Sequence, residues 1–218
     1  MRKEFLFKSA KPTLRGTAFS AFCAKHIRTM RKVKYFIANS LDNFIARPGG
    51  AVEWLFNDGT NYGMAEFFRS IDTILLGRKT FDFANSQTEK SKRRTRKAKR
   101  KGGVGWGMKS YVFSRTLKPE DHDDVTIISE EAGKFVRSLK SQPGKDIWLM
   151  GGGQLAGSLL AEDVVDEISL NIHPVLLGRG IPLFTELANQ VNLELFASKA
   201  HKNGCVQVDY RVKHSELA

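Results

Sequence analysis

Short apolar runs alternate with amphipathic stretches along the chain from Lys34 onward. Short runs rich in Val, Ile, Leu, Tyr and Phe are typical of buried strands, and apolar residues three and four positions apart are typical of helices. The runs predict strands over Tyr35–Ser40, Thr73–Gly77, Ser110–Ser114, Val125–Ile128 and Ile147–Met150. The stretches between them predict helices over Tyr62–Ser70, Thr80–Ala84, Glu131–Ser141 and Gln154–Ala161.

The pattern changes after Asp166. A long strand is predicted over Glu167–Leu177, and Asn192–His201 with Gly204–Lys213 form the two halves of a predicted hairpin. The turn of this hairpin is Lys202-Asn203-Gly204, in which Asn and Gly tolerate a positive φ. Alternating strands and helices followed by a hairpin predict an α/β fold, with a mostly parallel sheet flanked by helices and a C-terminal antiparallel hairpin.

Composition narrows the class of protein. The 218 residues suffice for one globular domain, and no run approaches the ~20 apolar residues that span a bilayer, which argues against a membrane protein. The only cysteines are Cys23 and Cys205, and the five histidines lack metal-ligand spacing, so we expect no disulfide scaffold and no metal site. We therefore expect a cytoplasmic protein.

Positive charge is concentrated in two segments. The formal net charge is +12, yet residues 1–30 hold seven Lys or Arg with one Glu, and residues 89–101 hold nine with one Glu. We expect residues 1–30 to be a disordered basic tail, although their Arg-rich, acid-poor composition also fits a transit peptide and Met30 fits an upstream start. Glycines follow the second segment, so residues 87–107 are expected to form a mobile basic loop insertion that binds nucleic acid only incidentally.

Ligand-binding chemistry is expected at the carboxyl ends of the strands, where helix N-termini present free backbone N–H groups. After the strand that ends at Gly77, Arg78 and Lys79 supply cations, and Thr80 supplies a hydroxyl that can cap the next helix. From the spacing alone, a phosphate site and a plain strand-to-helix turn with surface charges stay equally open.

Two further segments also follow the carboxyl ends of predicted strands. Ser114-Arg115-Thr116 ends a strand and suits a phosphate monoester, although a polar loop start explains the tripeptide as well. Gly151-Gly152-Gly153-Gln154 follows a buried strand, and its three glycines remove every Cβ where a ligand would approach the backbone. The turn is neither GxGxxG nor a P-loop, yet we expect it to contact a ligand.

Taken in order, five segments resemble the dihydrofolate reductase superfamily. The match is closer to its RibD C-terminal branch, the riboflavin-pathway reductase domain, than to dihydrofolate reductase itself. The segments are FIANSLDNFIA (36–46) followed by EWL (53–55), GRKTF (77–81), YVFSRTL (111–117), MGGGQL (150–155) and HPVLLGRGIPLF (173–184). The resemblance excludes the basic insertion, and it defines residues 31–218 as one reductase domain.

The resemblance implies an NADPH-dependent reductase that transfers a hydride to a C=N or carbonyl group of a pyrimidine-like, pterin-like or related small molecule, similar to 5-amino-6-(5-phosphoribosylamino)uracil reductase. Ser114 and Arg115 would face the 2′-phosphate of NADPH, Ala38 and Ile45 would border the nicotinamide, and Ala46–Val52 would be the flap over the ring. Arg78, Lys79 and Thr80 would lie along the pyrophosphate and the adenosine phosphate, and the backbone of Gly152, Gly153, Gln154 and Leu155 would hold the pyrophosphate. Gly77 and Gly151 complete the implied set of cofactor-binding residues. A homodimer formed through the terminal strands is also implied.

The sequence departs from the superfamily at the position of the catalytic carboxylate. Dihydrofolate reductases use a helix carboxylate, whereas the only acid in Asn61–Ser70 is Glu66, which disfavours folate reduction. Asp42 is therefore the catalytic candidate, as a substrate contact or proton relay, and a turn Asp that bonds its own backbone is the equal alternative. Because no acid is assured, a catalytically lapsed nucleotide-binding or polyanion-binding protein on the same fold stays open as a second function.

Overall fold

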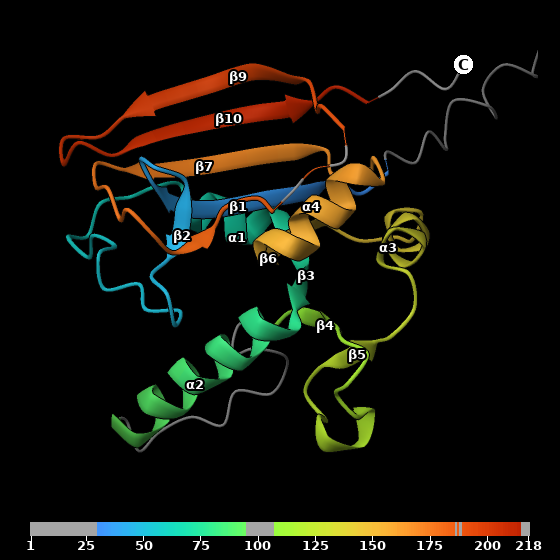
Figure 1. Cartoon of the computed structure of the whole chain (residues 1–218). Coiled ribbons are helices and arrows are strands. Elements are labelled where there is room, and N and C mark those ends of the chain that lie inside the picture. The colour runs from blue at the N-terminus through green and yellow to red at the C-terminus, as the bar shows by residue number, and fades with distance from the viewer. Residues whose placement is uncertain (1–29, 95–106, 186, 188, 215–218) are drawn as a thin grey trace, which may run out of the picture.

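The computed structural model describes residues 30–94, 107–185, 187 and 189–214. The main sheet contains β1 (Val33–Ser40), β3 (Ile71–Gly77), β4 (Lys109–Phe113), β5 (Thr126–Ile128), β6 (Asp146–Gly151), β7 (Glu167–His173), β9 (Leu193–Ala200) and β10 (Val206–Val212). These strands lie in the order β5-β4-β3-β6-β1-β7-β10-β9 (Figure 1). A small second sheet pairs β2 (Phe44–Ala46) with β8 (Ile181–Pro182).

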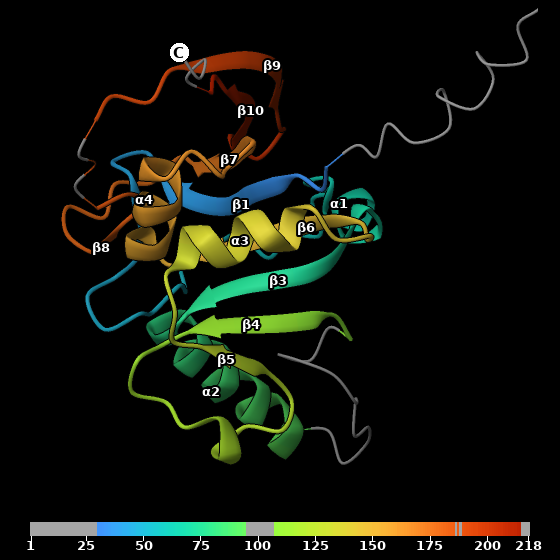
Figure 2. The same cartoon turned by 90° about the vertical axis from the view of Figure 1, so that its right-hand side faces the viewer.

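The strands from β5 to β7 are parallel to one another, and β10 and β9 add an antiparallel hairpin at the edge. Helices α3 (Ala132–Lys140) and α4 (Gly153–Ala161) cover one face of the sheet. Helices α1 (Met64–Ser70) and α2 (Arg78–Arg94) lie on the other face (Figure 2). The predicted α/β fold is therefore confirmed.

Two hydrophobic cores hold these layers together. On β3, Leu75 packs into the core beneath α3 and α4, while Ile74 and Leu76 pack with Phe67 of α1 and Phe81 of α2. Burial on both faces is typical of strands in a parallel sheet, because helices cover both sides. The central strands are therefore fixed, and their carboxyl ends form a rigid edge.

Helix α2 is longer than the sequence pattern predicts. It runs to Arg94 rather than ending at Ala84, so the predicted loop 87–107 is wrong for residues 87–94. Gln, Glu, Lys and Arg fill most of those positions, and these residues are strong helix formers even without an apolar face. Residues 95–106, like the predicted tail over residues 1–29, lie outside the described residues, so that part of both predictions is untested.

The other differences are at strand ends. β7 ends at His173 and not at Leu177, because Pro174 has no N–H group to continue the ladder. β2 and β8 were not predicted, since two or three residues give no periodic signal. The hairpin is confirmed, with Gly204 at a φ of 88° in its turn. In the part of the chain that is described, no helix has the length and apolar character needed to cross a membrane.

Candidate active site

Three of the predicted ligand segments follow neighbouring strands. β4, β3 and β6 lie side by side, and their carboxyl ends point to the same edge of the sheet (Figure 2). At Gly77, the end of β3, an added Cβ would lie 3.5 Å from Gly152 N and 3.7 Å from Leu155 Cβ. The end of β3 therefore lies close to the backbone of the turn after β6 and to the side chain of Leu155.

Arg78 connects the end of β3 with the loop after β4. Its Nη1 donates a hydrogen bond of 2.6 Å to Thr116 Oγ1, and its Nε lies 3.7 Å from Asp82 Oδ2. Ser114 Oγ accepts hydrogen bonds from the backbone N–H groups of Thr116 and Leu117 at 3.2 and 3.1 Å, which orders this loop. A guanidinium and two hydroxyls thus share one edge of the sheet.

Lys79 and Arg115 add two exposed cations, and within the described part of the chain neither has a hydrogen bond or ion pair. Thr80 was predicted to cap the helix, but α2 begins at Arg78 and places Thr80 in its first turn, because β3 passes directly into α2. Thr80 Oγ1 would lie 3.2 Å from a Cβ added at Gly152, so its hydroxyl faces the turn after β6.

The turn after β6 leads into an uncapped helix. α4 begins at Gly153, and no side chain caps its N-terminus, so the N–H groups of the first turn have no side-chain acceptor. Such an N-terminus favours an anion. A Cβ added at Gly153 would lie 2.6 Å from Pro182 O and 2.9 Å from Leu183 O. Glycine therefore allows the segment after β8 to approach this turn closely.

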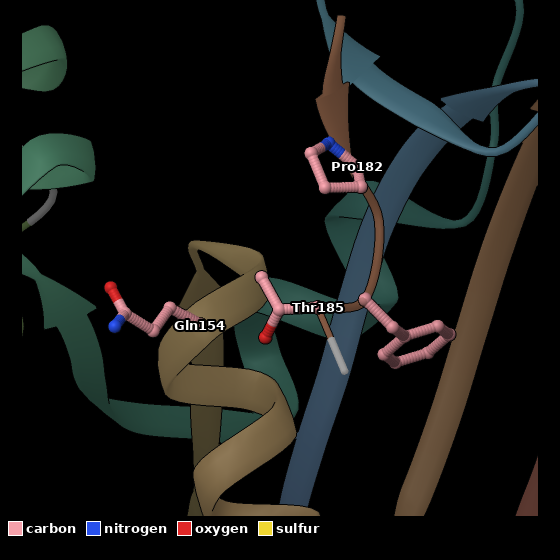
Figure 3. A pocket seen from close by; sticks show the side chains of 4 residues that line it. Gln154, Pro182 and Thr185 are labelled. Atoms are coloured by element: carbon pink, nitrogen blue, oxygen red, sulfur yellow. The ribbon is translucent and has the colours of Figure 1, made fainter. Parts of the chain in front are cut away.

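An open depression of about 610 Å³ lies beside this N-terminus, lined by Gln154, Pro182, Phe184 and Thr185 (Figure 3). Thr185 Oγ1 donates a hydrogen bond of 3.5 Å to Gly153 O. Leu155 is buried in the core, whereas the neighbouring Gln154 is exposed. Of these two predicted contacts, Leu155 thus offers a ligand its backbone, while Gln154 also offers a polar side chain.

Ala38 and Ile45 lie near the end of β1. Ala38 pairs with Asn171 of β7 and is half-buried, and Ile45 of β2 packs against the main core. Between them, Asn43 adopts a φ of 63°, a conformation that Asn tolerates better than most residues with a side chain.

The predicted flap, Ala46–Val52, forms a tight turn. Arg47 N donates to Ala51 O at 2.9 Å, and Gly50 N donates to Arg47 O at 2.9 Å. A Cβ added at Gly50 would lie 3.7 Å from Phe83 Cδ2, so the flap approaches α2. The flap thus lies between the end of β1 and the helix that follows β3.

The catalytic candidate Asp42 joins two loops. Its Oδ1 accepts hydrogen bonds from Ser40 Oγ at 2.6 Å and Leu177 N at 3.1 Å, and its Oδ2 accepts one from Gly178 N at 2.7 Å. These bonds, with that from Ser40 the strongest, hold the pKa of Asp42 below its usual range. The ionised carboxylate ties the loop after β7 to the turn after β1. Its predicted role toward substrate stays a prediction.

An aromatic cluster, consisting of Trp54, Phe56, Tyr62 and His173, lies at the end of β7. The ring centroids of Trp54, Phe56 and Tyr62 lie 5.4, 5.2 and 6.1 Å from that of His173. Burial lowers the pKa of His173, so its ring is neutral at pH 7. Its Nδ1 lies 3.2 Å from Asn171 O, which only accepts, so Nδ1 carries the proton and Nε2 is an acceptor.

Among the described residues, four buried side-chain atoms have no hydrogen-bond partner, namely Asn39 Oδ1, Trp54 Nε1, Asn171 Oδ1 and His201 Nε2. Asn171 lies two residues before His173 on β7, so both side chains are on one face of the sheet, and Ala38 pairs with Asn171 on the same face. An unpaired buried polar atom costs ~1–3 kcal/mol. The described residues thus leave a donor at Trp54 and an acceptor at Asn171 unused.

Sequence reasoning missed most of this cluster. The EWL segment placed Trp54 in a family motif without a role, and His173 appeared only as the first residue of another such motif. Tyr62 gave no signal, because its contact with His173 joins β7 to a loop more than a hundred residues earlier, and Asn171 belonged to no motif. By contrast, Glu66 is exposed and paired with Arg69, so the structure does not offer it as a folate-type acid.

The fold and the arrangement of its strand ends define a member of the dihydrofolate reductase superfamily. Within it, the chain belongs to the RibD C-terminal domain family, whose model matches residues 31–207. The uncharacterized protein YyaP of Bacillus subtilis is 37% identical over 180 residues, which cover 83% of this chain and 94% of YyaP.

Solved structures share the fold. A protein of Shewanella sp. PV-4 named for riboflavin biosynthesis has a TM-score of 0.70 and 24% identity, covering 84% of this chain and 99% of that chain. The diaminohydroxyphosphoribosylaminopyrimidine deaminase/5-amino-6-(5-phosphoribosylamino)uracil reductase of Thermotoga maritima has a TM-score of 0.59 and 16% identity, covering 84% of this chain and 57% of that chain.

Proposed function

We propose that this protein is an NADPH-dependent reductase that transfers a hydride to a C=N or carbonyl group of a small heterocycle, similar to 5-amino-6-(5-phosphoribosylamino)uracil reductase. One observation carries the proposal. At the adjacent carboxyl ends of β4, β3 and β6, the protein places basic side chains, hydroxyl side chains and a glycine backbone without Cβ atoms. Membership in the RibD C-terminal family supports this reductase chemistry, as does the name of the Thermotoga maritima relative, which includes a reductase.

The residues present fit this cofactor. The close approach of Gly77 and Gly152 leaves backbone without Cβ atoms, and the uncapped N-terminus of α4 attracts a pyrophosphate. Among the described residues Lys79 and Arg115 are unpaired cations, and Arg78 bonds the Thr116 hydroxyl beside Ser114, which suits the 2′-phosphate and the adenosine side. When bound, NADPH would supply the hydride.

The chain's own residues would orient the reacting groups. Ala38 and Ile45 border the nicotinamide in this proposal, and the flap Ala46–Val52 excludes water from the ring. Trp54 Nε1 and Asn171 Oδ1 supply a donor and an acceptor to a polar substrate on the same face as Ala38. Asp42 orders the loop after β7, and it is the proposed substrate contact or proton relay.

The first test of this proposal is cofactor choice. Energy transfer from tryptophan to bound nicotinamide measures the dissociation constants of NADPH and NADH separately. We expect Arg115→Ala to weaken NADPH binding ~10- to 100-fold and to leave NADH binding unchanged, since one charge-assisted contact to the 2′-phosphate is lost. Lys109→Ala is the matched control, because Lys109 is an exposed cation at the opposite end of the same strand.

The second test is turnover. A panel of oxidised pyrimidines, pterins and imines is offered with NADPH, and the loss of nicotinamide absorbance is followed. Reduction of one heterocycle supports the proposal. Absence of NADPH binding at millimolar concentration contradicts it, and NADPH binding without any turnover favours the catalytically lapsed nucleotide-binding protein.

A further inference from the structure

The loop from Glu53 to Gly63 carries three of the four rings of the aromatic cluster, and it has no helix or strand of its own. Its backbone hydrogen bonds are local, such as Leu55 N to Val52 O at 3.1 Å and Thr60 N to Asp58 Oδ1 at 3.0 Å. A loop of this length needs contacts outside itself to hold a single conformation.

Besides the ring contacts with His173, most of the polar contacts come from one side chain in the β9–β10 turn. Asn203 Nδ2 lies 2.8 Å from Asp58 Oδ2, 2.6 Å from Tyr62 Oη and 3.2 Å from Thr60 Oγ1. On its other side, Asn203 Oδ1 accepts a hydrogen bond of 3.1 Å from Cys205 N, which fixes the amide in one orientation. The two N–H donors of a single amide therefore face three acceptors on side chains of the loop, and we call this arrangement the Asn203 clasp.

The clasp acts directly on the aromatic cluster through Tyr62. The Tyr62 hydroxyl also donates to Cys205 Sγ at 3.6 Å, and its ring lies 4.9 Å from that of His201 and 6.1 Å from that of His173. Among the described residues, these bonds to Asn203 and Cys205 are the polar links that join residues 57–62 to the rest of the protein.

The turn that carries Asn203 is itself well anchored. Gly204 has a φ of 88°, and a Cβ added there would lie 3.3 Å from Pro174 Cγ, so the turn packs against the residue that follows β7. His201 N donates to Cys205 O at 2.8 Å and closes the hairpin. The bonds of Thr60 and Asn203 also lower the pKa of Asp58 to about 2, so the clasp holds an ionised carboxylate at neutral pH.

We propose that Asn203 is a positioning residue, which holds Trp54 and Tyr62 against His173 and so fixes one wall of the substrate side of the site without contacting substrate. This role rests on the proposed reductase function, because that function places substrate on the face that Ala38 and Asn171 share.

The test exchanges the partners of the clasp. Asn203→Asp sets two carboxylates against each other and removes the donor to Tyr62, whereas Asp58→Asn/Asn203→Asp restores one amide and one carboxylate with reversed polarity. In the double variant the Tyr62 and Thr60 hydroxyls can donate to the new carboxylate. Asn192→Asp, at an exposed asparagine just before β9, is the matched control.

The first readout needs no ligand. The protein is labelled with 5-fluorotryptophan, and the ¹⁹F resonance of Trp54 is identified by its absence in Trp54→Phe. We expect Asn203→Asp to move the Trp54 resonance toward that of a solvent-exposed tryptophan, the double variant to return it, and Asn192→Asp to leave it in place. Asp58→Asn alone gives a smaller shift in the same direction, which keeps the test decisive if Asn203→Asp does not fold.

The second readout separates positioning from general stability. With the best substrate of the panel, Asn203→Asp should raise KM about tenfold and change kcat less than threefold, since a few hydrogen bonds that order the wall are lost. The dissociation constant of NADPH should stay within twofold. A Trp54 resonance that does not move in Asn203→Asp, or a double variant that restores nothing, overturns the proposal. If the wild type fails to bind NADPH while the Trp54 resonance responds as expected, only the reductase function is contradicted.

Discussion

Asp42 accepts hydrogen bonds from Ser40, Leu177 and Gly178, and these bonds stabilise its ionised form. Its pKa in the folded protein lies below the value of about 3.9 of an unfolded Asp. The bonds therefore add stability above about pH 4, and this contribution is lost as the pH falls through the folded pKa. We expect Asp42→Asn to lower the melting temperature at pH 7, and the melting curves of variant and wild type to converge below about pH 4.

Circular dichroism melts between pH 2.5 and 7 measure this effect. Asp121→Asn is the control, because the side chain of Asp121 is exposed and has no hydrogen bond in the described structure. A proton relay at Asp42 has a different signature, in which Asp42→Asn removes turnover and leaves the melting temperature at neutral pH unchanged. The two measurements together decide between the loop-ordering and the relay role of this residue.

Residues that serve local backbone geometry could be predicted from the sequence. Gly153 lies where a Cβ would collide with Pro182 O, and Asn43 lies where the backbone takes a positive φ; short motifs around both residues indicate these requirements. Asn203 and Trp54 could not be predicted in the same way. Asn203 bonds a residue 145 positions earlier, and only the folded hairpin brings the two together.

At the scale of helices and strands, the boundaries of long elements could be predicted from the sequence, and those of short elements could not. The bounds of strands long enough to bury one face were predicted within a few residues. Strands β2 and β8 were missed, because two or three residues show no hydrophobic period. The length of α2 was underestimated for another reason. The second half of the helix is rich in charged residues and is followed by glycines, and this composition was interpreted as a loop. The intrinsic helix preference of Lys, Arg, Glu and Gln nevertheless extends α2 to Arg94.

The basic segment over residues 89–101 is expected to act independently of the nucleotide site. The residues proposed to hold the cofactor lie at the ends of β3, β4 and β6, so replacing the nine Lys and Arg of this segment by Gln and Ser should leave the dissociation constant of NADPH unchanged. Affinity for heparin at low salt should fall at least tenfold, because that binding depends on counterion release.

Heparin-column elution and the NADPH titration measure the two properties on the same preparation. The nucleotide-binding interpretation of the strand ends is contradicted if the neutralised variant loses NADPH as well as heparin. Retained affinity for both would show that the polyanion surface lies elsewhere.

At the scale of the whole molecule, the sheet ends in an edge strand, β9, that no part of the described chain covers. All eight residues of β9 are exposed, and they include Leu193, Leu195 and Phe196 at 40%, 53% and 42% exposure. An apolar edge strand with open backbone groups pairs readily with another chain. We propose that a second copy of this protein covers β9, which agrees with the homodimer that the resemblance implies.

Sedimentation equilibrium tests this proposed dimer by measuring the molecular mass of the protein in solution. Leu195→Lys places a charge in the centre of the edge, and burying an unpaired charge in an interface of ~800 Å² per partner is costly. We expect the wild type to be dimeric at micromolar concentration and Leu195→Lys to be monomeric with an unchanged helix signal. Leu176→Lys, at a leucine that is 72% exposed in the loop after β7, should stay dimeric. A monomeric wild type, or a dimeric Leu195→Lys, would mean that β9 is not the contact between copies and that the exposed leucines serve another partner or none.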